Sequence, residues 1–182
     1  MAGGVAAYVR KMRGGGKAPP AVRWSEVGWS WLGAFLGMLA VAALEYRVAG
    51  DAAVWLIGSF GATAVLVYGA IRSPLAQPRN VVGGHVVSAV VGVACQQLVG
   101  DVPGLAAPLA VATAIALMHL TRTLHPPGGA TALIAVIAGP AITGLGFLYV
   151  AVPVGGGAVI LTLVAVLVNN LSGARRYPEF WW

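Results

Sequence analysis

The sequence has few charged residues and a single cysteine. Charged side chains make up 9% of the 182 residues and hydrophobic ones 59%, whereas a typical soluble domain has roughly 25% charged residues. Such a chain cannot cover a surface that faces water, which excludes a soluble globular domain. Because lipid can solvate apolar side chains, the composition instead predicts a single all-α, polytopic transmembrane bundle.

The scarcity of particular side chains excludes several kinds of chemistry. Cys95 is the only cysteine and lies in an apolar run, so it cannot form an intrachain disulfide and is interpreted as a small buried side chain. Acidic residues are missing from the centres of the apolar runs, which argues against a proton relay built on carboxylates. The sequence shows neither a metalloprotease-type His-Glu motif nor a nucleophile paired with a base. We therefore expect no metal, no cofactor and no enzymatic activity.

Six apolar stretches are candidates to cross a bilayer, which requires about 20 residues each. They are Val27–Ala43, Ala52–Ile71, Val81–Val99, Leu105–Leu120, Gly129–Ile142 and Gly146–Leu171. The fifth is short and contains Gly139-Pro140, so it is either a full span or a re-entrant element. The sixth is long but interrupted by Pro153 and three glycines. The predicted organisation is a basic N-terminal segment (1–26), a transmembrane domain (27–171) and a C-terminal tail (172–182).

The distribution of basic residues predicts the orientation. With six spans and an inside N-terminus, every basic residue except Arg47 falls on the inner side. Five of them precede the first span, and Arg175 and Arg176 follow the last; these seven are interpreted as orientation signals. Adding or removing one span would invert the later loops, so the positive-inside rule favours both termini in the cytoplasm. Membrane lipid is an expected partner, and nucleic acid is not.

Two inner loops share one pattern, and each is expected either to stay at the inner surface or to re-enter the membrane between the spans. The first loop, Arg72–His85, and the second loop, Arg122–Thr131, each contain an arginine, a serine or threonine, a proline-rich turn and a glycine pair before an apolar helix. Proline suits the first turn of a helix, and glycine permits close approach of the backbone. Each loop is therefore predicted to aim the unpaired N–H groups of the next helix toward the inner side, a geometry that binds anions.

The candidate anion site combines both loops with two asparagines at the inner end of the last span. Arg72 and Arg122 would attract charge, and the glycine pairs at the helix starts would donate backbone N–H groups. The alternative stays open that the arginines only orient the chain and the prolines only end helices. The candidate residues are Arg72, Ser73, Gln77, Arg79, Asn80, Gly83, Gly84, His85, Arg122, Thr123, His125, Pro126, Pro127, Gly128, Gly129, Thr131, Asn169 and Asn170.

Other residues have more than one interpretation. His125 is expected to donate to a backbone carbonyl or to the anion, and His119 to be satisfied within the bundle; pH-sensitive binding through a histidine is a further option. The asparagine pair either bonds across helices as a structural group or faces the loops. Gly33 and Gly37 form a small-xxx-small pair, typical of packing within a bundle or of a dimer, and the abundance of small residues predicts a homo-oligomer.

The run from His125 to Leu133, His-Pro-Pro-Gly-Gly-Ala-Thr-Ala-Leu, resembles the signature of the HPP family of integral membrane proteins. The stretches Ser73–Asn80, Gly83–His85 and Asn169-Asn170, the last followed by Arg175–Pro178, resemble further motifs of that family in the same order. The resemblance covers the chain from Trp24 onward. It implies a membrane protein of a family found in bacteria, cyanobacteria and plastids, with some members linked to nitrite transport.

The leading hypothesis is a transporter or channel for nitrite or a similar small anion. The expected location is the bacterial inner membrane, or the plastid envelope in a photosynthetic eukaryote. The alternative is a non-transporting membrane scaffold or sensor, in which the same motifs only lock the helices together.

Overall fold

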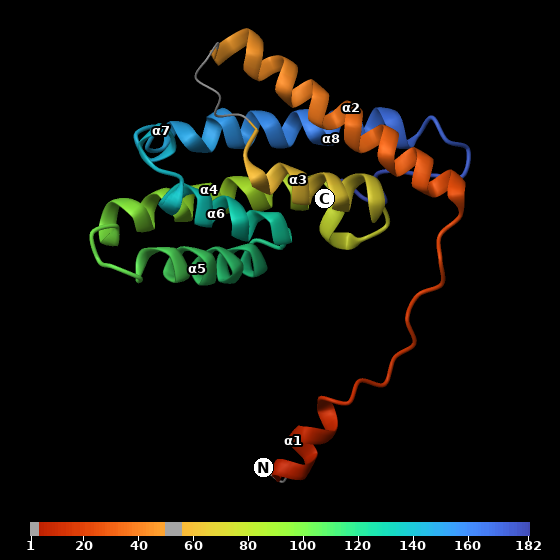
Figure 1. Ribbon diagram of the computed structural model, residues 1–182, viewed down its shortest axis with the longest axis horizontal. Helices are drawn as coiled ribbons and strands as arrows, with labels where there is room; N and C mark the ends of the chain where they lie inside the picture. Colours follow the sequence, from red (N-terminus) through yellow and green to blue (C-terminus); the bar gives the residue numbers. More distant parts are fainter. Residues whose placement is uncertain (1–3, 50–55) are drawn as a thin grey trace.

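The computed structural model describes residues 4–49 and 56–182, and within these ranges the chain contains helices and no strands (Figure 1). Asp51 and the start of the second predicted span at Ala52 lie outside the described residues. The elements are α1 (Val5–Lys11), α2 (Trp24–Ala49), α3 (Gly58–Ala64), the π-helical η1 (Val65–Gly69), the 3-10 turn η2 (Pro74–Ala76), α4 (Pro78–Val99), α5 (Ala106–Leu120), α6 (Pro126–Ile137), α7 (Pro140–Thr143), the π-helical η3 (Val150–Gly155) and α8 (Gly156–Asn169).

Three of the apolar helical segments have the length and composition of membrane spans. They are Trp24–Leu44 in α2, Pro78–Val99 in α4 and Val150–Asn169 in η3 and α8. Three shorter apolar segments, Gly58–Gly69, Ala106–Leu120 and Pro126–Ile137, correspond to the second, fourth and fifth predicted spans. At about 1.5 Å per residue they fall short of the roughly 30 Å hydrocarbon core. The structure thus supports a helical membrane protein whose predicted spans differ in length.

The fifth predicted span, Gly129–Ile142, is not one helix. Helix α6 begins earlier, at Pro126, and ends at Ile137, and α7 is a separate helical turn. Gly139 between them has a φ of 79°, which glycine adopts without a steric penalty, and Pro140 cannot donate to the preceding turn. The expected interruption of the sixth span is confirmed, because Val152 just before Pro153 has a non-helical backbone, with φ −136° and ψ 121°.

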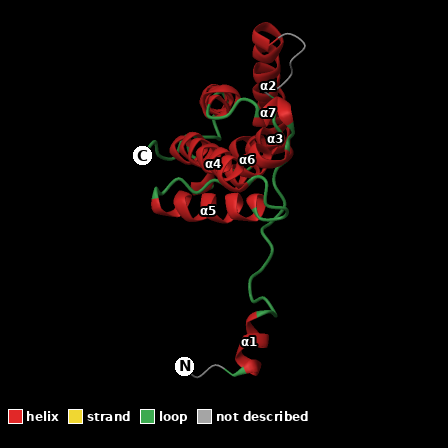
Figure 2. Cartoon of the chain, turned by 90° about the vertical axis from the view of Figure 1, so that its left-hand side faces the viewer, coloured by secondary structure: helices red, strands yellow, loops and turns green. Residues whose placement is uncertain are grey.

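The helices lie side by side in layers. In Figures 1 and 2, α4 and α6 lie between α8 on one side and α5 on the other, and α2 crosses over α8. The colours of Figure 1 show that α2, α4 and α6 begin at the same end of the bundle at which η1, α5 and α8 finish. This end carries Arg23, Arg72, Arg79, Arg122 and Arg175, so we call it the basic end.

The outer faces of the bundle are apolar, as a lipid-solvated protein requires. Leu98, Leu120 and Leu167 are each exposed by 69% or more. Packing inside the bundle relies instead on small residues, which let helices approach closely where the hydrophobic effect does not drive association. Gly33 and Gly37 of α2 both face the ring of Tyr68, and a Cβ added at Gly33 would lie 2.5 Å from its Cδ1. This glycine pair therefore packs within its own chain.

Candidate functional site

The two loops pack against each other at the basic end of the bundle. The Asn80 side chain donates to the Leu124 carbonyl at 2.9 Å, and Arg79 donates to the Thr121 carbonyl at 3.3 Å. His125, the residue before α6, contacts the Leu75 carbonyl of η2 through Nδ1 at 2.8 Å. The first loop thus supplies the hydrogen-bond partners that hold the second.

A threonine from a third element joins the two histidines of the loops. Nε2 of His85 and Nε2 of His125 both face the Thr63 hydroxyl of α3, at 2.7 and 3.0 Å. The two imidazole rings meet edge to face with their centroids 5.0 Å apart. Three segments that are distant in the sequence therefore converge on one hydroxyl group.

The polar contacts continue on the other side of His85. Its Nδ1 lies 2.7 Å from the Thr131 hydroxyl of α6, and Thr131 lies 2.9 Å from the Ser59 hydroxyl, one turn before Thr63 in α3. Ser59, Thr63, His85, His125 and Thr131 form what we call the histidine cluster. All five residues have 0% exposure. Burial of so many polar groups is tolerated because each has a partner.

Aromatic and small residues pack around the histidine cluster. The Phe60 ring contacts His85 edge to face at a centroid distance of 5.4 Å, and Gly157 of α8 lies directly against Phe60. At Gly84, an added Cβ would lie 2.6 Å from the His125 Cβ and 2.7 Å from the Thr123 carbonyl oxygen. The absence of a side chain at Gly84 therefore lets the second loop approach α4 closely.

Three of the four glycines predicted to donate backbone N–H groups to an anion, Gly83, Gly84 and Gly128, use these groups within the fold. Helix α4 begins at Pro78, so Gly83 and Gly84 lie in its second turn, where amides bond carbonyls of the same helix. Helix α6 begins with two prolines, which have no N–H, and the Gly128 amide bonds the His125 carbonyl at 2.8 Å. The glycines instead provide packing space: a Cβ at Gly128 would lie 2.6 Å from the Ser88 hydroxyl oxygen.

The loop arginines lie around the basic end at separate places. Arg72 is exposed and lines a pocket of about 560 Å³ together with Arg23 and Arg175. Arg79 borders a different, mostly apolar groove that includes Trp181 and Trp182. Arg122 is exposed and has a φ of 57°. The structure thus brings Arg72 together with two basic residues that the sequence had suggested were orientation signals.

Comparison with known proteins places this architecture in a family. The family model for the HPP transmembrane region matches residues 19–178, which is nearly the whole chain. The chain belongs to the HPP transmembrane family. Its eponymous residues are His125, Pro126 and Pro127, where the histidine joins the buried cluster and the prolines begin α6.

Two relatives are transmembrane proteins of Dictyostelium discoideum. One is 47% identical over 179 residues, covering 96% of this chain and 57% of the relative, and the other is 46% identical over 181 residues, covering 96% and 63%. The HPP chain thus spans about three fifths of the length of these relatives. No solved structure matches it.

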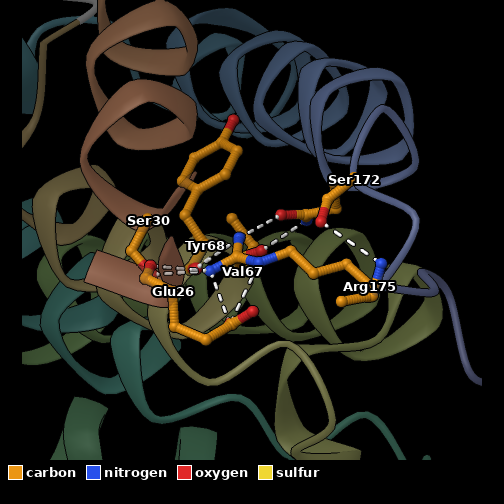
Figure 3. A network of polar contacts seen from close by, with 8 residues as sticks. Glu26, Ser30, Val67, Tyr68, Ser172 and Arg175 are labelled. Carbon is orange, nitrogen blue, oxygen red and sulfur yellow. Dashed lines mark hydrogen bonds and ion pairs between the residues drawn. The ribbon is translucent and has the colours of Figure 1, made fainter. Parts of the chain in front are cut away.

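A buried arginine network fastens the C-terminal tail of this HPP protein to α2 (Figure 3). The Arg175 side chain is 1% exposed and forms an ion pair with Glu26 at 2.9 Å. It also donates to the Ser30 hydroxyl at 2.8 Å, to the Asn169 side-chain oxygen at 2.9 Å and to the Tyr68 carbonyl at 3.2 Å. The assignment of Arg175 as an orientation signal therefore missed a structural role, which we call the Arg175 network; Arg176 is exposed.

The two asparagines serve this network and the tail. Asn169 donates to the Val67 carbonyl of η1 at 2.9 Å, which satisfies an acceptor near the end of that helix. Asn170 bonds the backbone N–H and carbonyl of Tyr177. In these contacts the pair bonds across elements, which is the structural interpretation left open above.

The tail also holds the first loop. The Tyr177 hydroxyl donates to the Ala76 carbonyl at 2.7 Å, and the Glu179 amide donates to the Gln77 side chain at 2.8 Å. Burial raises the pKa of Tyr177 above its usual range, so its phenol remains a donor. Gln77 in turn donates to the carbonyls of Ile71 and Ser73. The turn that receives the His125 contact is thus fixed from the tail.

Sequence reasoning missed Ser59 and Thr63. Both lie in an apolar run, four residues apart and therefore on one face of a helix, which is the signal that could have identified them.

The expectation for His119 is wrong, because that side chain is exposed on the outside of α5. Within residues 4–49 and 56–182, no group of three histidine, cysteine or acidic side chains is placed to hold a metal ion.

Proposed function

We propose that this HPP protein is a membrane transporter or channel for a small inorganic anion, with nitrite as the leading substrate. The observation that carries the proposal is the fully buried histidine cluster inside an apolar helical bundle. Polar side chains are expensive at membrane depth and commonly line substrate or ion pathways. The resemblance of the motifs to those of relatives linked to nitrite transport supplies the substrate.

The charge distribution favours an anion over a cation. The pocket at the basic end is bordered by Arg23, Arg72 and Arg175, with Glu26 as its acidic residue. A basic surface raises the local concentration of anions. The same turn that borders this pocket through Ser73 supplies the Leu75 carbonyl to His125. An anion gathered at the pocket would therefore stand one turn of chain from the histidine cluster.

The proposed topology follows the positive-inside rule. We place the basic end in the cytoplasm, with six crossings and both termini inside the bacterial inner membrane. The exposed leucines contact lipid, and further copies of the chain pack through the apolar outer faces in a homo-oligomer. In this orientation Arg72, Arg79 and Arg122 face the cytoplasmic mouth of the pathway.

Flux measurements test the proposed function. Purified protein in liposomes should raise nitrite entry above that of protein-free vesicles, which also correct for the nitrous acid that crosses lipid unaided. Arg72→Ala and Arg122→Ala should each reduce the flux because they remove charge at the mouth. Arg176→Ala, an exposed arginine of the same end outside both loops, should leave it near the wild-type value. Equal flux with and without protein would contradict the proposal.

The rival function, a non-transporting scaffold or sensor, is favoured by one observation. Among the described residues, every buried side-chain nitrogen and oxygen already has a hydrogen-bond partner, as a purely structural core requires. A thermal-shift series with nitrite, nitrate, chloride and bicarbonate separates the two functions. A transported anion should raise the melting temperature, because ligand binding to the folded state stabilises it.

A further inference from the structure

The histidine cluster has a defined arrangement of hydrogens when both rings are neutral. The Leu75 carbonyl can only accept, so Nδ1 of His125 carries a hydrogen and Nε2 needs a donor. The Thr63 hydroxyl supplies that donor. Thr63 then accepts from Nε2 of His85, and Nδ1 of His85 accepts from the Thr131 hydroxyl, which in this arrangement does not donate to Ser59. In this series of hydrogen bonds every hydrogen points from Thr131 toward the Leu75 carbonyl.

The same atoms accommodate one additional proton. With a hydrogen also on Nε2, His125 donates to the Thr63 oxygen, and the Thr63 hydroxyl hydrogen turns to the Ser59 carbonyl oxygen, 3.1 Å away. His85 has a parallel option, because a hydrogen on its Nδ1 would donate to Thr131, whose hydroxyl lies 2.9 Å from the Ser59 hydroxyl oxygen. Rotation of hydroxyl groups is sufficient, and no heavy atom needs to move.

A proton alone is poorly stabilised at this position. Burial disfavours the charged form of a histidine, and the described acidic side chains lie away from the cluster: Glu26 is paired with Arg175, and Asp101 and Glu179 are exposed. An anion alone is also disfavoured, because none of the described arginines donates a hydrogen bond to a residue of the cluster. Each charge would therefore raise the affinity of the site for the other.

We propose that the histidine cluster is a proton-binding site and that its proton crosses the membrane together with one anion. This inference rests on the proposed function and specifies its coupling ion. One proton leaves a hydronium ion on one side, forms an N–H bond in the site, and is released to water on the other side together with one monovalent anion, so no net charge moves. Thr63 positions the proton by offering one oxygen to both rings.

Few other titratable groups can act on this site. The elements packed against the histidines contribute the Tyr149 phenol, which donates to the Thr131 carbonyl at 3.1 Å, and the Tyr177 phenol, which bonds the Ala76 carbonyl next to Leu75. Arg79 donates to the Thr121 carbonyl just before the second loop and not to a residue of the cluster. Among the described residues, the two histidine rings are thus the groups of the cluster that can bind an additional proton.

The decisive experiment measures proton movement and anion flux together. Liposomes containing the wild-type protein and a pH-sensitive dye are given an inward nitrite gradient, with the membrane potential clamped by potassium and valinomycin. Protein-free vesicles correct for nitrous acid, and nitrate, whose conjugate acid is strong, serves as a second anion. We expect the lumen to acidify by one proton per anion that enters through the protein, and the flux to be independent of the clamped potential.

Substitutions identify where the proton binds. Glutamine at either ring position can keep both a donor and an acceptor but cannot take up a proton, so His125→Gln and His85→Gln should abolish the coupled acidification. His119→Gln, a change at an exposed histidine, should retain it. Thr63→Ser should keep the coupling because it keeps the hydroxyl. Size-exclusion chromatography and thermal denaturation establish which variants fold.

The outcomes separate this inference from the proposed function. Anion flux that responds to the membrane potential and moves no protons would overturn the coupling and leave anion transport standing. Wild-type acidification that persists in folded His125→Gln and His85→Gln protein would also overturn it, because the proton would bind elsewhere. Absence of protein-dependent flux for either anion would overturn the proposed function and the coupling together. The wild-type stoichiometry tests the coupling even where one variant does not fold, and the other histidine variant then tests the location of the proton.

Discussion

At the scale of single residues, Thr63 makes the hydrogen bonds that join the two histidines of the cluster. Its hydroxyl contacts two imidazole nitrogens and the Ser59 carbonyl, while a second buried threonine, Thr162, contacts only the Ala158 carbonyl of its own helix at 2.8 Å. The two threonines are therefore similarly buried, but only the Thr63 hydroxyl bonds side chains from other elements. This contrast isolates the energetic role of the histidine cluster from that of a buried threonine in general.

We predict that Thr63→Val lowers the free energy of unfolding by about 1–3 kcal/mol, because the two ring nitrogens lose their shared partner. Thr63→Ser should recover most of the loss. Thr162→Val should change stability by no more than about 0.5 kcal/mol, since its carbonyl partner already accepts a helical hydrogen bond. Thermal denaturation in detergent measures all three. Equal melting temperatures for Thr63→Val and Thr162→Val would show that the cluster contributes little stability.

At the scale of secondary-structure elements, the contact between α2 and η1 depends on one face of α2. Gly33 and Gly37 lie against the Tyr68 ring, whose hydroxyl donates to the Leu161 carbonyl of α8 at 3.0 Å. Tyr68 thus joins three elements, and the glycines leave room for it. Gly28 on the same helix faces open space.

We predict opposite effects for the same substitution at two positions of α2. Gly37→Ala should destabilise the protein by about 1–3 kcal/mol, because its Cβ would collide with the Tyr68 hydroxyl. Gly28→Ala should be neutral or stabilising by up to about 1 kcal/mol, because alanine is the better helix former. Adding Tyr68→Phe to Gly37→Ala should recover part of the loss by removing the colliding oxygen. Thermal denaturation of the four proteins tests this, and a destabilised Gly28→Ala would contradict the packing argument.

At the scale of the whole molecule, the Arg175 network connects the end of the chain to its first span. The guanidinium group reaches Glu26 and Ser30 of α2, Asn169 of α8 and the Tyr68 carbonyl of η1. The adjacent tail residues hold the turn that contacts His125. Release of the tail would therefore loosen both the bundle and the candidate site.

We predict that Arg175→Ala costs about 3 kcal/mol of stability, since it leaves buried acceptors and part of a carboxylate without their cation. Arg175→Lys should not restore it, because an ammonium cannot reproduce the planar set of guanidinium donors. Arg176→Ala is the matched control and should have little effect, because Arg176 is exposed. Melting temperature and limited proteolysis of the tail provide the measurements. If the tail resists proteolysis equally in both alanine variants, Arg175 does not hold the tail against α2.

The proposed topology makes a separate prediction that uses the single cysteine. In a Cys95→Ala background, Gly15→Cys and Gly173→Cys place one thiol near either terminus, and Val102→Cys places one between α4 and α5 at the other end of the bundle. An impermeant maleimide on intact cells should label only Val102→Cys, and should label all three after permeabilisation. Labelling of either terminal variant on intact cells would refute the cytoplasmic placement of that terminus.

Much of the architecture was predictable because it depends on local composition. Apolar length predicted the helical segments, Pro126 and Pro78 mark helix starts, and Pro153 marks the break before α8. These features follow from the geometry of proline and from the absence of water in the bilayer, which forces the backbone to satisfy its own hydrogen bonds. The family was also predictable, since its motifs are contiguous stretches of sequence.

The sequence by itself determined that this is a helical membrane protein with a basic end and two Pro-Gly loops. Only the tertiary structure decided what the loops do: they bring His85 and His125 onto Thr63, a residue 22 and 62 positions away in the chain. It also decided that Gly83, Gly84 and Gly128 leave room for close packing and that Arg175 is buried. The physical reason is that composition constrains each segment separately, whereas hydrogen bonds and close contacts between side chains depend on which helix faces meet.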